Sequence, residues 1–391
     1  MANYTWTECP NTSDTHRSIC CSDDGVYVYA GFGEKIFKSS NSGVSFTNIR
    51  SLSGNSFGMC SRNGNVVSYA LTSGPVWVST DYGSNWSNPI PYGQGWQSAC
   101  MTPDGSKIFL TTYIFYPVIV TTSDMNYQYL YEFYPNQTHA IFGAYISPDG
   151  SHLACYDGTS YVERYSSDGG ASWSYAGMYY ACPTSQAVSR DGTSRIYGGN
   201  WTSYLCGSSD FGVTWFTITR PWVWSPQFVP TNFATNGDGS TIIMANGQNP
   251  GDVMYLSRDF GATWVATASS RNWTSVAISS NGAVAYATVW YGNIWKGVLD
   301  PPTITSLNNP SGLVGATIYV YGTLFTGATA VRFNGVPAIS FGVNADDLFH
   351  AVVPVGATTG TISIDAPSGT ATSTAVFTVT KPGTSKFFEV L

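Results

Sequence analysis

The stretch Ser257-Arg258-Asp259-Phe260-Gly261-Ala262-Thr263-Trp264 decides how this chain is expected to fold. Its pattern, Ser-x-Asp-x-Gly-x-Thr-Trp, recurs with few changes at residues 208–215, 166–173 and 79–86. Two weaker copies occur at residues 39–46, with Asn41 in the place of Asp, and at residues 122–129, with Asn126 in the place of Gly. The aromatic ends at 46, 86, 129, 173, 215 and 264 recur every 40 to 49 residues. A fixed period of this size, built on strands, is typical of propellers and similar arrays.

Each copy is expected to form a turn that its own side chains hold. The Asp or Asn would accept hydrogen bonds from the following backbone amides, and the Gly or Asn would adopt positive φ. The aromatic end would insert into the core as a large apolar side chain. The motif resembles the Asp box, or BNR repeat, of sialidases, sortilin-type receptors, xyloglucan-cleaving glycosidases and photosystem II assembly factors. That resemblance implies the architecture but no activity, because these families share the box and not a chemistry. The residues in the Asp position are Asn41, Asp81, Asp124, Asp168, Asp210 and Asp259.

A second repeat, an Asx-Gly pair, alternates with the first. Such pairs between apolar runs are a strong hairpin signal. Each period then predicts four strands, which is the content of one propeller blade. The seven pairs are Asp24-Gly25, Asn63-Gly64, Asp104-Gly105, Asp149-Gly150, Asp191-Gly192, Asp238-Gly239 and Asn281-Gly282.

Seven pairs but six boxes leave the last blade one strand short. Residues 3–7, Asn-Tyr-Thr-Trp-Thr, are similar to the strand that leaves a box at residues 261–265. We therefore expect the N-terminal strand to complete the last blade and to remove the open edges. The prediction for residues 1–300 is an all-β, seven-bladed β-propeller closed by its N-terminal strand.

After Pro301-Pro302 the period changes, and residues 301–380 alternate short strands with Gly-rich turns. This segment is similar to the IPT/TIG family of immunoglobulin-like β-sandwiches. That resemblance implies a spacer or contact domain rather than an enzyme. The tail, residues 381–391, is either a frayed end or a strand donated to a neighbour. The stretches that carry the resemblance are residues 304–306, 315–317, 321–325, 331–336, 353–360 and 375–379.

The composition narrows the choice of partners. Charged residues make up 10% of the chain and aromatic residues 15%, and the net charge is −7. Without a basic patch, nucleic acid is not an expected partner. No apolar run approaches about 18 residues, so no membrane insertion is expected.

The first six residues show no secretory signal, yet six glycosylation sequons favour an extracellular, cell-surface or virion-surface protein. The eight Cys are compatible with disulfides or with buried thiols. No metal or cofactor is expected, although a calcium site in residues 246–252 is a weaker alternative. The sequons are at Asn3, Asn11, Asn85, Asn136, Asn200 and Asn272.

Catalytic residues are hard to assign. A glycosidase needs two carboxylates, but turns and boxes explain most acids in residues 1–300, and Asp157 and Glu163 are among the few left over. Arg17, Arg50, Arg220 and Arg271 lie where a carboxylate clamp could form, but no spacing makes three of them converge. No catalytic residue is therefore predicted.

Aromatic residues in the longer loops are a better lead. Asx-Gly turns and boxes are expected to share one face of the disc, which leaves the longer loops on the other face, and loops of that kind carry function. Exposed Trp and Tyr stack on sugars and anchor protein interfaces, although about half of this set is expected to be buried. The candidates are Tyr92, Trp96, Tyr113, Phe115, Tyr116, Tyr134, Tyr179, Tyr180, Trp201, Tyr204, Trp222, Trp224, Trp290 and Tyr291.

These observations favour a non-catalytic surface protein. Its propeller would bind a glycan or a protein, or associate with other copies as a homo-oligomer, a fibre or part of a virion, and its IPT/TIG-like segment would serve as stalk or assembly contact. The alternative is a sialidase-like or xyloglucanase-like glycoside hydrolase of the Asp-box type. An assembly factor is a third, weaker possibility.

Overall fold

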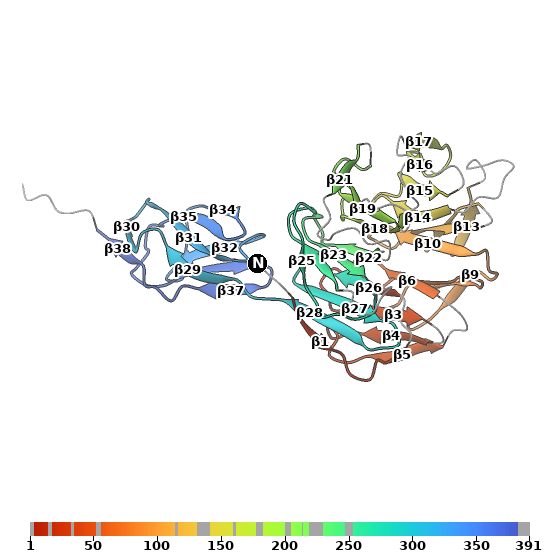
Figure 1. Ribbon diagram of the computed structural model, residues 1–391, viewed down its shortest axis with the longest axis horizontal. Coiled ribbons are helices and arrows are strands. Elements are labelled where there is room, and N and C mark those ends of the chain that lie inside the picture. Colours follow the sequence, from red (N-terminus) through yellow and green to blue (C-terminus); the bar gives the residue numbers. More distant parts are fainter. Residues whose placement is uncertain are drawn as a thin grey trace, which may run out of the picture. The chain divides into compact units, whose positions relative to one another are not determined.

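The computed structural model describes residues 4–14, 18–32, 35–51, 56–113, 116–130, 141–158, 162–176, 183–199, 205–212, 214–218, 230–246 and 253–381. All regular structure in these residues is β-strand, as Figure 1 shows. None of them belongs to a helix that could cross a membrane. The chain divides into two compact units, one of which is Thr5–Gly297, whereas the other combines Met1–Tyr4 with Val298–Leu391.

The described part of residues 4–299 forms seven four-stranded sheets, six of which use consecutive strands. The first three are β2 (Ser18–Cys21), β3 (Val28–Phe32), β4 (Lys35–Ser39) and β5 (Thr47–Ser51); β6 (Ser56–Cys60), β7 (Val67–Leu71), β8 (Val76–Ser79) and β9 (Ser87–Ile90); β10 (Trp96–Met101), β11 (Lys107–Thr112), β12 (Val118–Thr121) and β13 (Asn126–Tyr129). The next three are β14 (Ile141–Ile146), β15 (Leu153–Asp157), β16 (Val162–Ser166) and β17 (Ser174–Ala176); β18 (Pro183–Val188), β19 (Arg195–Gly199), β20 (Leu205–Ser208) and β21 (Phe216–Ile218); β22 (Pro230–Thr235), β23 (Ile242–Asn246), β24 (Tyr255–Ser257) and β25 (Val265–Ala266).

The seventh sheet combines the two ends of this part of the chain. Its order is β1-β28-β27-β26, with β1 (Tyr4–Glu8), β26 (Trp273–Ile278), β27 (Val284–Val289) and β28 (Ile294–Leu299). Trp6 of β1 lies against Gly297 of β28, and its indole Nε1 donates to Thr267 Oγ1 at 3.3 Å. The first strand of the chain is therefore held by residues about 260 to 290 positions away.

The sheets pack face to face through their first strands. β2 contacts β6, the series continues through β10, β14, β18 and β22 to β26, and β26 contacts β2. In Figure 1 the strands β6, β10, β14, β18, β22 and β26 lie toward the middle of this unit, and β5, β9, β13, β17, β21, β25 and β1 at its outside. Because neighbouring sheets cover both faces of each sheet, every residue of β7, β15 and β23 is buried and these strands lack an exposed face.

The Asx-Gly pairs form the hairpins between first and second strands. In the first of them, Gly25 N donates to Ser22 O at 2.9 Å, so Gly25 is the last residue of a β-turn and adopts φ 71°. Ser22 Oγ donates to Asp24 Oδ1 at 2.6 Å and accepts from Tyr27 N at 2.9 Å. The residue two positions before each pair is therefore part of the turn, which explains why Ser, Thr or Asn recurs there.

The box at residues 257–264 is held by its own side chains. Asp259 Oδ1 accepts from Ser257 Oγ at 2.9 Å and from Thr263 N at 2.8 Å, and its Oδ2 accepts from Thr263 Oγ1 at 2.6 Å. Trp264 Nε1 donates to Gly261 O at 3.0 Å, which fixes the half-buried ring against the turn. Phe260 as well as Gly261 adopts positive φ, at 57° and 89°.

Both kinds of turn lie at the same end of the sheets. The residue before the box Gly donates its N–H to the carbonyl just after the Asx-Gly pair of the same sheet, as Phe260 N does to Ser240 O at 3.1 Å. The same bond joins Tyr82 to Asn65 and Phe211 to Thr193.

The copy at residues 122–129 departs from this geometry. Asn126 does not adopt positive φ but begins β13 and pairs with Thr121, so the turn contains only residues 122–125. Met125, at φ 57°, supplies the left-handed residue instead. Tyr129 is consequently the last residue of β13 and not the aromatic end of a box. The substitution of Gly by Asn shortens the hairpin rather than preserving the box.

Residues 303–380 form two four-stranded sheets and a short parallel pair that share one core. The sheet orders are β29-β31-β35-β34 and β33-β32-β36-β37, and β30 pairs with β38. In β31 (Thr317–Thr323), Ile318 and Val320 are buried and their neighbours exposed, as in a sheet covered on one face only. The other strands are β29 (Thr303–Leu307), β30 (Ser311–Leu313), β32 (Ala330–Phe333), β33 (Val336–Pro337), β34 (Phe341–Ala345), β35 (Leu348–Val352), β36 (Ile362–Ala366), β37 (Gly369–Thr372) and β38 (Thr378–Thr380). The shared core includes Phe325, Phe333, Phe349 and Phe377.

Candidate functional site

Acidic side chains in residues 4–299 are engaged in holding the fold wherever the structure describes them. The hydrogen bond from Asn85 N is the largest of several contacts that lower the pKa of Asp81 to about 2. The hydroxyl and the amide of Ser172 do the same for Asp168, whose pKa is also lowered to about 2. Outside turns and boxes, Asp14 pairs with Lys35 at 3.7 Å, and Glu8 accepts a hydrogen bond from Asn293 at 2.6 Å. Among the described residues no group of three or more His, Cys, Asp or Glu could hold a metal ion.

One carboxylate and two guanidiniums meet at the ends of the first strands. Asp23 pairs with Arg190 and lies 3.8 Å from Arg62 Nε, beside a cavity of about 180 Å³. Burial raises the pKa of Asp23 and outweighs the two guanidiniums, which lower it. A single carboxylate held by two arginines is not the acid pair that glycoside hydrolysis requires.

The same positions carry a belt of backbone hydrogen bonds between successive sheets. At five of the seven positions, the residue before the Asx-Gly pair donates its N–H to the carbonyl of its counterpart in the next sheet, as Asp23 N does to Arg62 O at 2.6 Å. Two counterparts are prolines, which have no N–H to donate. The seven positions are Asp23, Arg62, Pro103, Pro148, Arg190, Gly237 and Ser280.

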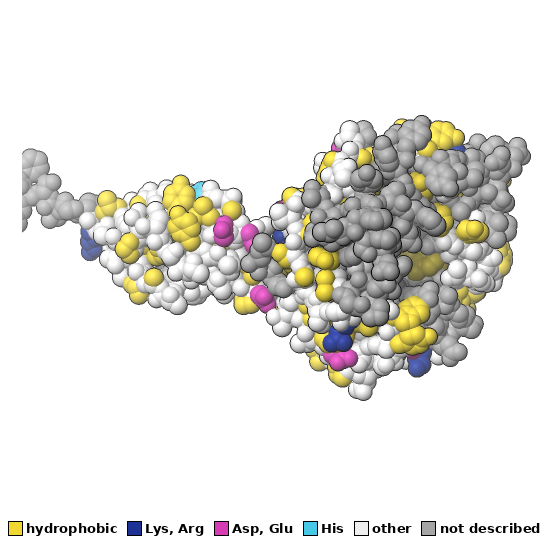
Figure 2. Space-filling view, in the orientation of Figure 1, with side chains coloured by type: hydrophobic (Ala, Val, Ile, Leu, Met, Phe, Trp, Pro, Cys, Tyr) yellow, Lys and Arg dark blue, Asp and Glu magenta, His cyan; other side chains and the backbone are white. Residues whose placement is uncertain are grey.

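Five candidates from the loop aromatics are at least partly exposed. Tyr113 is 56% exposed and Tyr291 is 74% exposed. Tyr92 is also exposed and shares a 2.6 Å hydrogen bond between hydroxyls with Tyr127. Figure 2 shows how few charged side chains accompany the exposed hydrophobic ones on the face in view. We call Tyr92, Tyr113, Tyr116, Trp290 and Tyr291 the loop-face aromatics.

Trp96 does not belong to that surface. It is 1% exposed, it packs in the core between the second and third sheets, and its indole Nε1 donates to Gly74 O at 3.1 Å. Its place at the start of β10, an inner strand, buries it although the sequence around it is polar. The other candidates lie outside the described residues: Phe115, Tyr134, Tyr179, Tyr180, Trp201, Tyr204, Trp222 and Trp224.

The candidate arginines, the calcium loop and the cysteines do not come together in one site among the described residues. Arg50 stacks on Trp77 with 3.7 Å between the guanidinium carbon and the ring centroid, and Arg271 stacks on Trp295 at 4.1 Å. Arg17 and Arg220 lie outside the described residues, as does most of the proposed calcium loop. The seven described Cys are free thiols, so no disulfide forms among them.

Of the sequons, Asn11 and Asn85 are exposed and Asn272 is half-buried. The side-chain amide of Asn85 also donates to Asp81 Oδ2 at 2.6 Å. Asn3, Asn136 and Asn200 lie outside the described residues.

A cavity of about 430 Å³ lies between the sheet β14–β17 and the sheet β18–β21. Its inner wall includes Glu163, Arg195 and Tyr145, and its mouth Tyr165, Tyr175 and Phe211. We call it the inter-sheet pocket. Its volume lies within the range of about 300–1,000 Å³ that is usual for small-molecule sites.

A buried ion pair forms the wall of the inter-sheet pocket. Arg195 Nη2 donates to Glu163 Oε1 at 2.5 Å, and Tyr197 OH donates to the same oxygen at 2.7 Å. The Arg195 guanidinium carbon lies 4.5 Å from the centroid of the Tyr145 ring. Burial lowers the pKa of Arg195, but Glu163 and Tyr197 together outweigh it, so the net shift is upward. Arg195 therefore remains a cation opposite the Glu163 carboxylate.

A second buried ion pair lies within the sheet β14–β17, which also carries Glu163. Arg164 Nε is 3.5 Å from Asp157 Oδ2, and both side chains are almost fully buried. Arg164 Nη2 also donates to Tyr175 OH at 2.8 Å, and its guanidinium stacks on that ring at 4.3 Å. Asp157 and Glu163, two of the acids that the repeats leave unexplained, are thus both paired with arginine.

Glu163 and Arg195 could have been found by aligning the repeats. Three residues before the box Ser, where Glu163 lies, the other copies carry Ile36, Val76, Ile119, Leu205 and Met254. Three residues after the Asx-Gly glycine, where Arg195 lies, the other sheets carry Val28, Val67, Ile108, Leu153, Ile242 and Ala285. A carboxylate and a guanidinium have thus replaced apolar residues at facing core positions of adjacent sheets.

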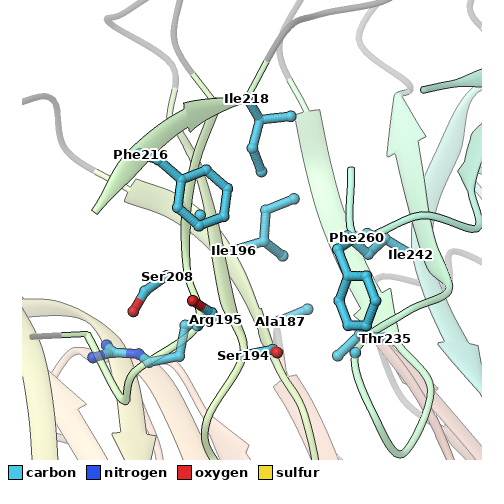
Figure 3. A pocket seen from close by; sticks show the side chains of 13 residues that line it. Ala187, Ser194, Arg195, Ile196, Ser208, Phe216, Ile218, Thr235, Ile242 and Phe260 are labelled. Atoms are coloured by element: carbon cyan, nitrogen blue, oxygen red, sulfur yellow. The ribbon is translucent and has the colours of Figure 1, made fainter. Parts of the chain in front are cut away.

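The neighbouring cavity, between the sheets β18–β21 and β22–β25, provides a comparison (Figure 3). It has a volume of about 280 Å³ and a largely apolar lining that includes Ile196, Phe216, Ile218 and Phe260. Figure 3 shows that Arg195 directs its guanidinium away from Phe260. The guanidinium of Arg195 therefore faces the inter-sheet pocket.

The sequence matches no protein-family model, and no curated protein matches it. The solved structures that share its fold include two β-propellers. YCF48 from Cyanidioschyzon merolae is 14% identical with a TM-score of 0.56, and the match covers 74% of this chain and 98% of that one. The β-propeller domain of Cps50 (Swd1) from Myceliophthora thermophila is 12% identical with a TM-score of 0.62, and the match covers 75% of this chain and 99% of that one. These similarities show an all-β chain with a β-propeller fold and carry no information on its activity.

Proposed function

We propose that residues 1–300 form a closed, seven-bladed Asp-box propeller and that residues 301–380 form an IPT/TIG immunoglobulin-like domain. The contacts that run from β2 through all seven sheets back to β2 support closure, as does the pairing of β1 with β28. One bond of the belt crosses that junction, because Ser280 N donates to Asp23 O at 2.8 Å. The core shared by two four-stranded sheets supports the second assignment.

This protein acts, in our proposal, by binding and not by catalysis. The observation that carries the proposal is the engagement of the acids: each described carboxylate in residues 4–299 has a hydrogen-bond or ion-pair partner within the chain. The left-over acids are no exception, because Glu163 is 1% exposed and paired with Arg195, and Asp157 is buried and paired with Arg164. Glycoside hydrolysis needs two carboxylates beside the substrate, whereas Glu163 is the single carboxylate among the described residues that line the inter-sheet pocket, and it is held by Arg195.

The binding surface that we assign to the propeller is the set of loop-face aromatics. Tyr and Trp side chains supply large, rigid contact areas for sugars and protein surfaces. The low charge of the chain is compatible with packing against other copies as well. The exposed sequons favour an extracellular, cell-surface or virion-surface location, with the IPT/TIG-like domain as stalk or assembly contact.

A glycan array and light scattering test this proposal together. We expect the intact chain to bind a glycan or to form a defined assembly. The double variant Y113A/Y291A should weaken that interaction without lowering thermal stability, because both rings are exposed. F260A, which changes an aromatic residue that is 52% exposed at the box end of the sheets, is the matched control. A strict monomer that binds neither glycan nor protein would contradict the proposal.

A further inference from the structure

We propose that the inter-sheet pocket binds a neutral saccharide of one or two rings. The inference rests on the proposed binding function and gives it a site and a ligand class that are independent of the loop-face aromatics. Four features of the pocket support it: the residues that replaced the apolar core, an unpartnered acceptor, the charge balance and the aromatic mouth.

The stability of the fold does not by itself explain why two core positions carry charged residues. Glu163 and Arg195 occupy positions at which the other repeats carry apolar side chains. A buried ion pair is often no more stabilising than the apolar residues that could replace it, because both charges lose their hydration. The pair is therefore better explained by something that the pocket holds than by packing between the two sheets.

Two polar atoms in side chains that line the pocket have no partner among the described residues. Glu163 Oε1 accepts from both Arg195 and Tyr197, whereas Glu163 Oε2 is buried and has no donor. The hydroxyl of Tyr145, in a side chain that is 2% exposed, also lacks a partner. Buried polar atoms of this kind cost free energy unless a ligand or water satisfies them. A sugar that displaces the side chains covering these two atoms can donate a hydroxyl hydrogen to Glu163 Oε2 and accept one from Tyr145 OH.

The charge of the pocket selects a neutral ligand. Among the lining side chains Arg195 offsets Glu163, and the imidazole of His152 shares a hydrogen bond with Ser151 Oγ at 2.8 Å. Arg164 offsets Asp157 in the adjoining strand. An ion that entered would lose its hydration without finding an uncompensated opposite charge. A polyhydroxylated ring needs only the hydrogen-bonding groups that the wall offers.

The mouth supplies apolar contact for the faces of a sugar ring. Tyr175 is 63% exposed, Phe211 is 48% exposed and Tyr165 is 42% exposed, and all three line the cavity. Phe211 reaches the pocket because it occupies the left-handed position of its box, at φ 62°. Aromatic rings at the rim and hydrogen-bonding groups at the wall match the two kinds of surface that a pyranose carries.

The test measures the binding of small glycosides to the full chain by calorimetry and by ligand-observed NMR. The probes are the methyl glycosides of glucose, galactose, mannose and N-acetylglucosamine, with glucuronic acid as the charged comparator. We expect at least one neutral probe to bind, and glucuronic acid to bind more weakly. F211A should weaken binding by about tenfold. F260A is the matched control, because it makes the same change at the same box position, at φ 57°, beside the neighbouring cavity.

A second variant removes the pocket chemistry without an unpaired buried charge. The triple change Glu163→Leu, Arg195→Val and Tyr197→Phe installs apolar side chains and is expected to melt no lower than the natural chain while losing the glycoside. The proposal is wrong if no neutral probe binds, if F260A weakens binding as much as F211A does, or if the triple variant still binds. Array binding that survives the triple variant but is lost in Y113A/Y291A would leave the proposed function standing without this pocket.

Discussion

A box carboxylate is useful here because it satisfies several donors of one turn at once. In the first copy, Asn41 does nearly the same: its Oδ1 accepts from Ser39 Oγ at 2.9 Å and from Ser45 N at 3.0 Å, and its amide donates to Ser45 Oγ. The sequence indicated these partners because the motif keeps Ser, Asp and Thr at fixed spacing. It did not indicate that the residue before Gly also adopts positive φ, since Phe260, Phe211 and Tyr82 are unusual there.

The variant D81A tests this role. We expect it to lower the free energy of unfolding by about 1 kcal/mol at pH 7, because two backbone amides lose their acceptor, whereas D81N should cost less, as Asn41 indicates. The pKa of Asp81 in the fold, about 2, is below the unfolded value of about 3.9. Its stabilisation is thus present above about pH 4 and is lost as the pH falls toward 2. Urea denaturation across this range should show the deficit of D81A shrinking, and a deficit that stays constant to pH 2 would contradict the role.

The sequence predicts the strands less consistently than it predicts the turns. Alternating patterns identify strands such as β31, which has one exposed face, whereas β7, β15 and β23 are buried on both faces and show no alternation. The hairpin of β12 and β13 was mistaken for a box, because Asn126 fits the left-handed position in composition but is used as a strand residue. The burial of Trp96 follows from its place on an inner strand, which composition cannot reveal.

At the scale of a single element, the strand β1 can be tested for its contribution to the stability of the seventh sheet. Trp6 packs on Gly297, and its ring lies 6.0 Å from that of Trp273. We expect W6A to lower the free energy of unfolding by about 2 kcal/mol, less than the loss of a fully buried Trp. T5A, a change at an exposed position of the same strand, should stay within about 0.5 kcal/mol of the natural chain. Equal urea midpoints for W6A and T5A would show that β1 does not hold the seventh sheet.

For the protein as a whole, the 40-to-49-residue period of a turn motif was enough to predict an all-β chain with a propeller fold. The inter-sheet pocket was not predicted, because its wall joins Glu163 and Arg195 from different sheets and only a comparison of all the repeats shows both to be exceptional. The meeting of Asp23 with Arg62 and Arg190 was missed for the same reason: three hairpins supply one residue each.

Turnover of fluorogenic glycosides is the most direct test of whether any carboxylate of the propeller takes part in catalysis. The intact chain, D157N and E163Q would be assayed on one panel, with the fold of each variant verified by circular dichroism. We predict that the intact chain shows no hydrolysis above the buffer blank on any member of the panel. Hydrolysis by the intact chain that a folded D157N or E163Q variant loses would contradict the assignment and identify the protein as a glycoside hydrolase.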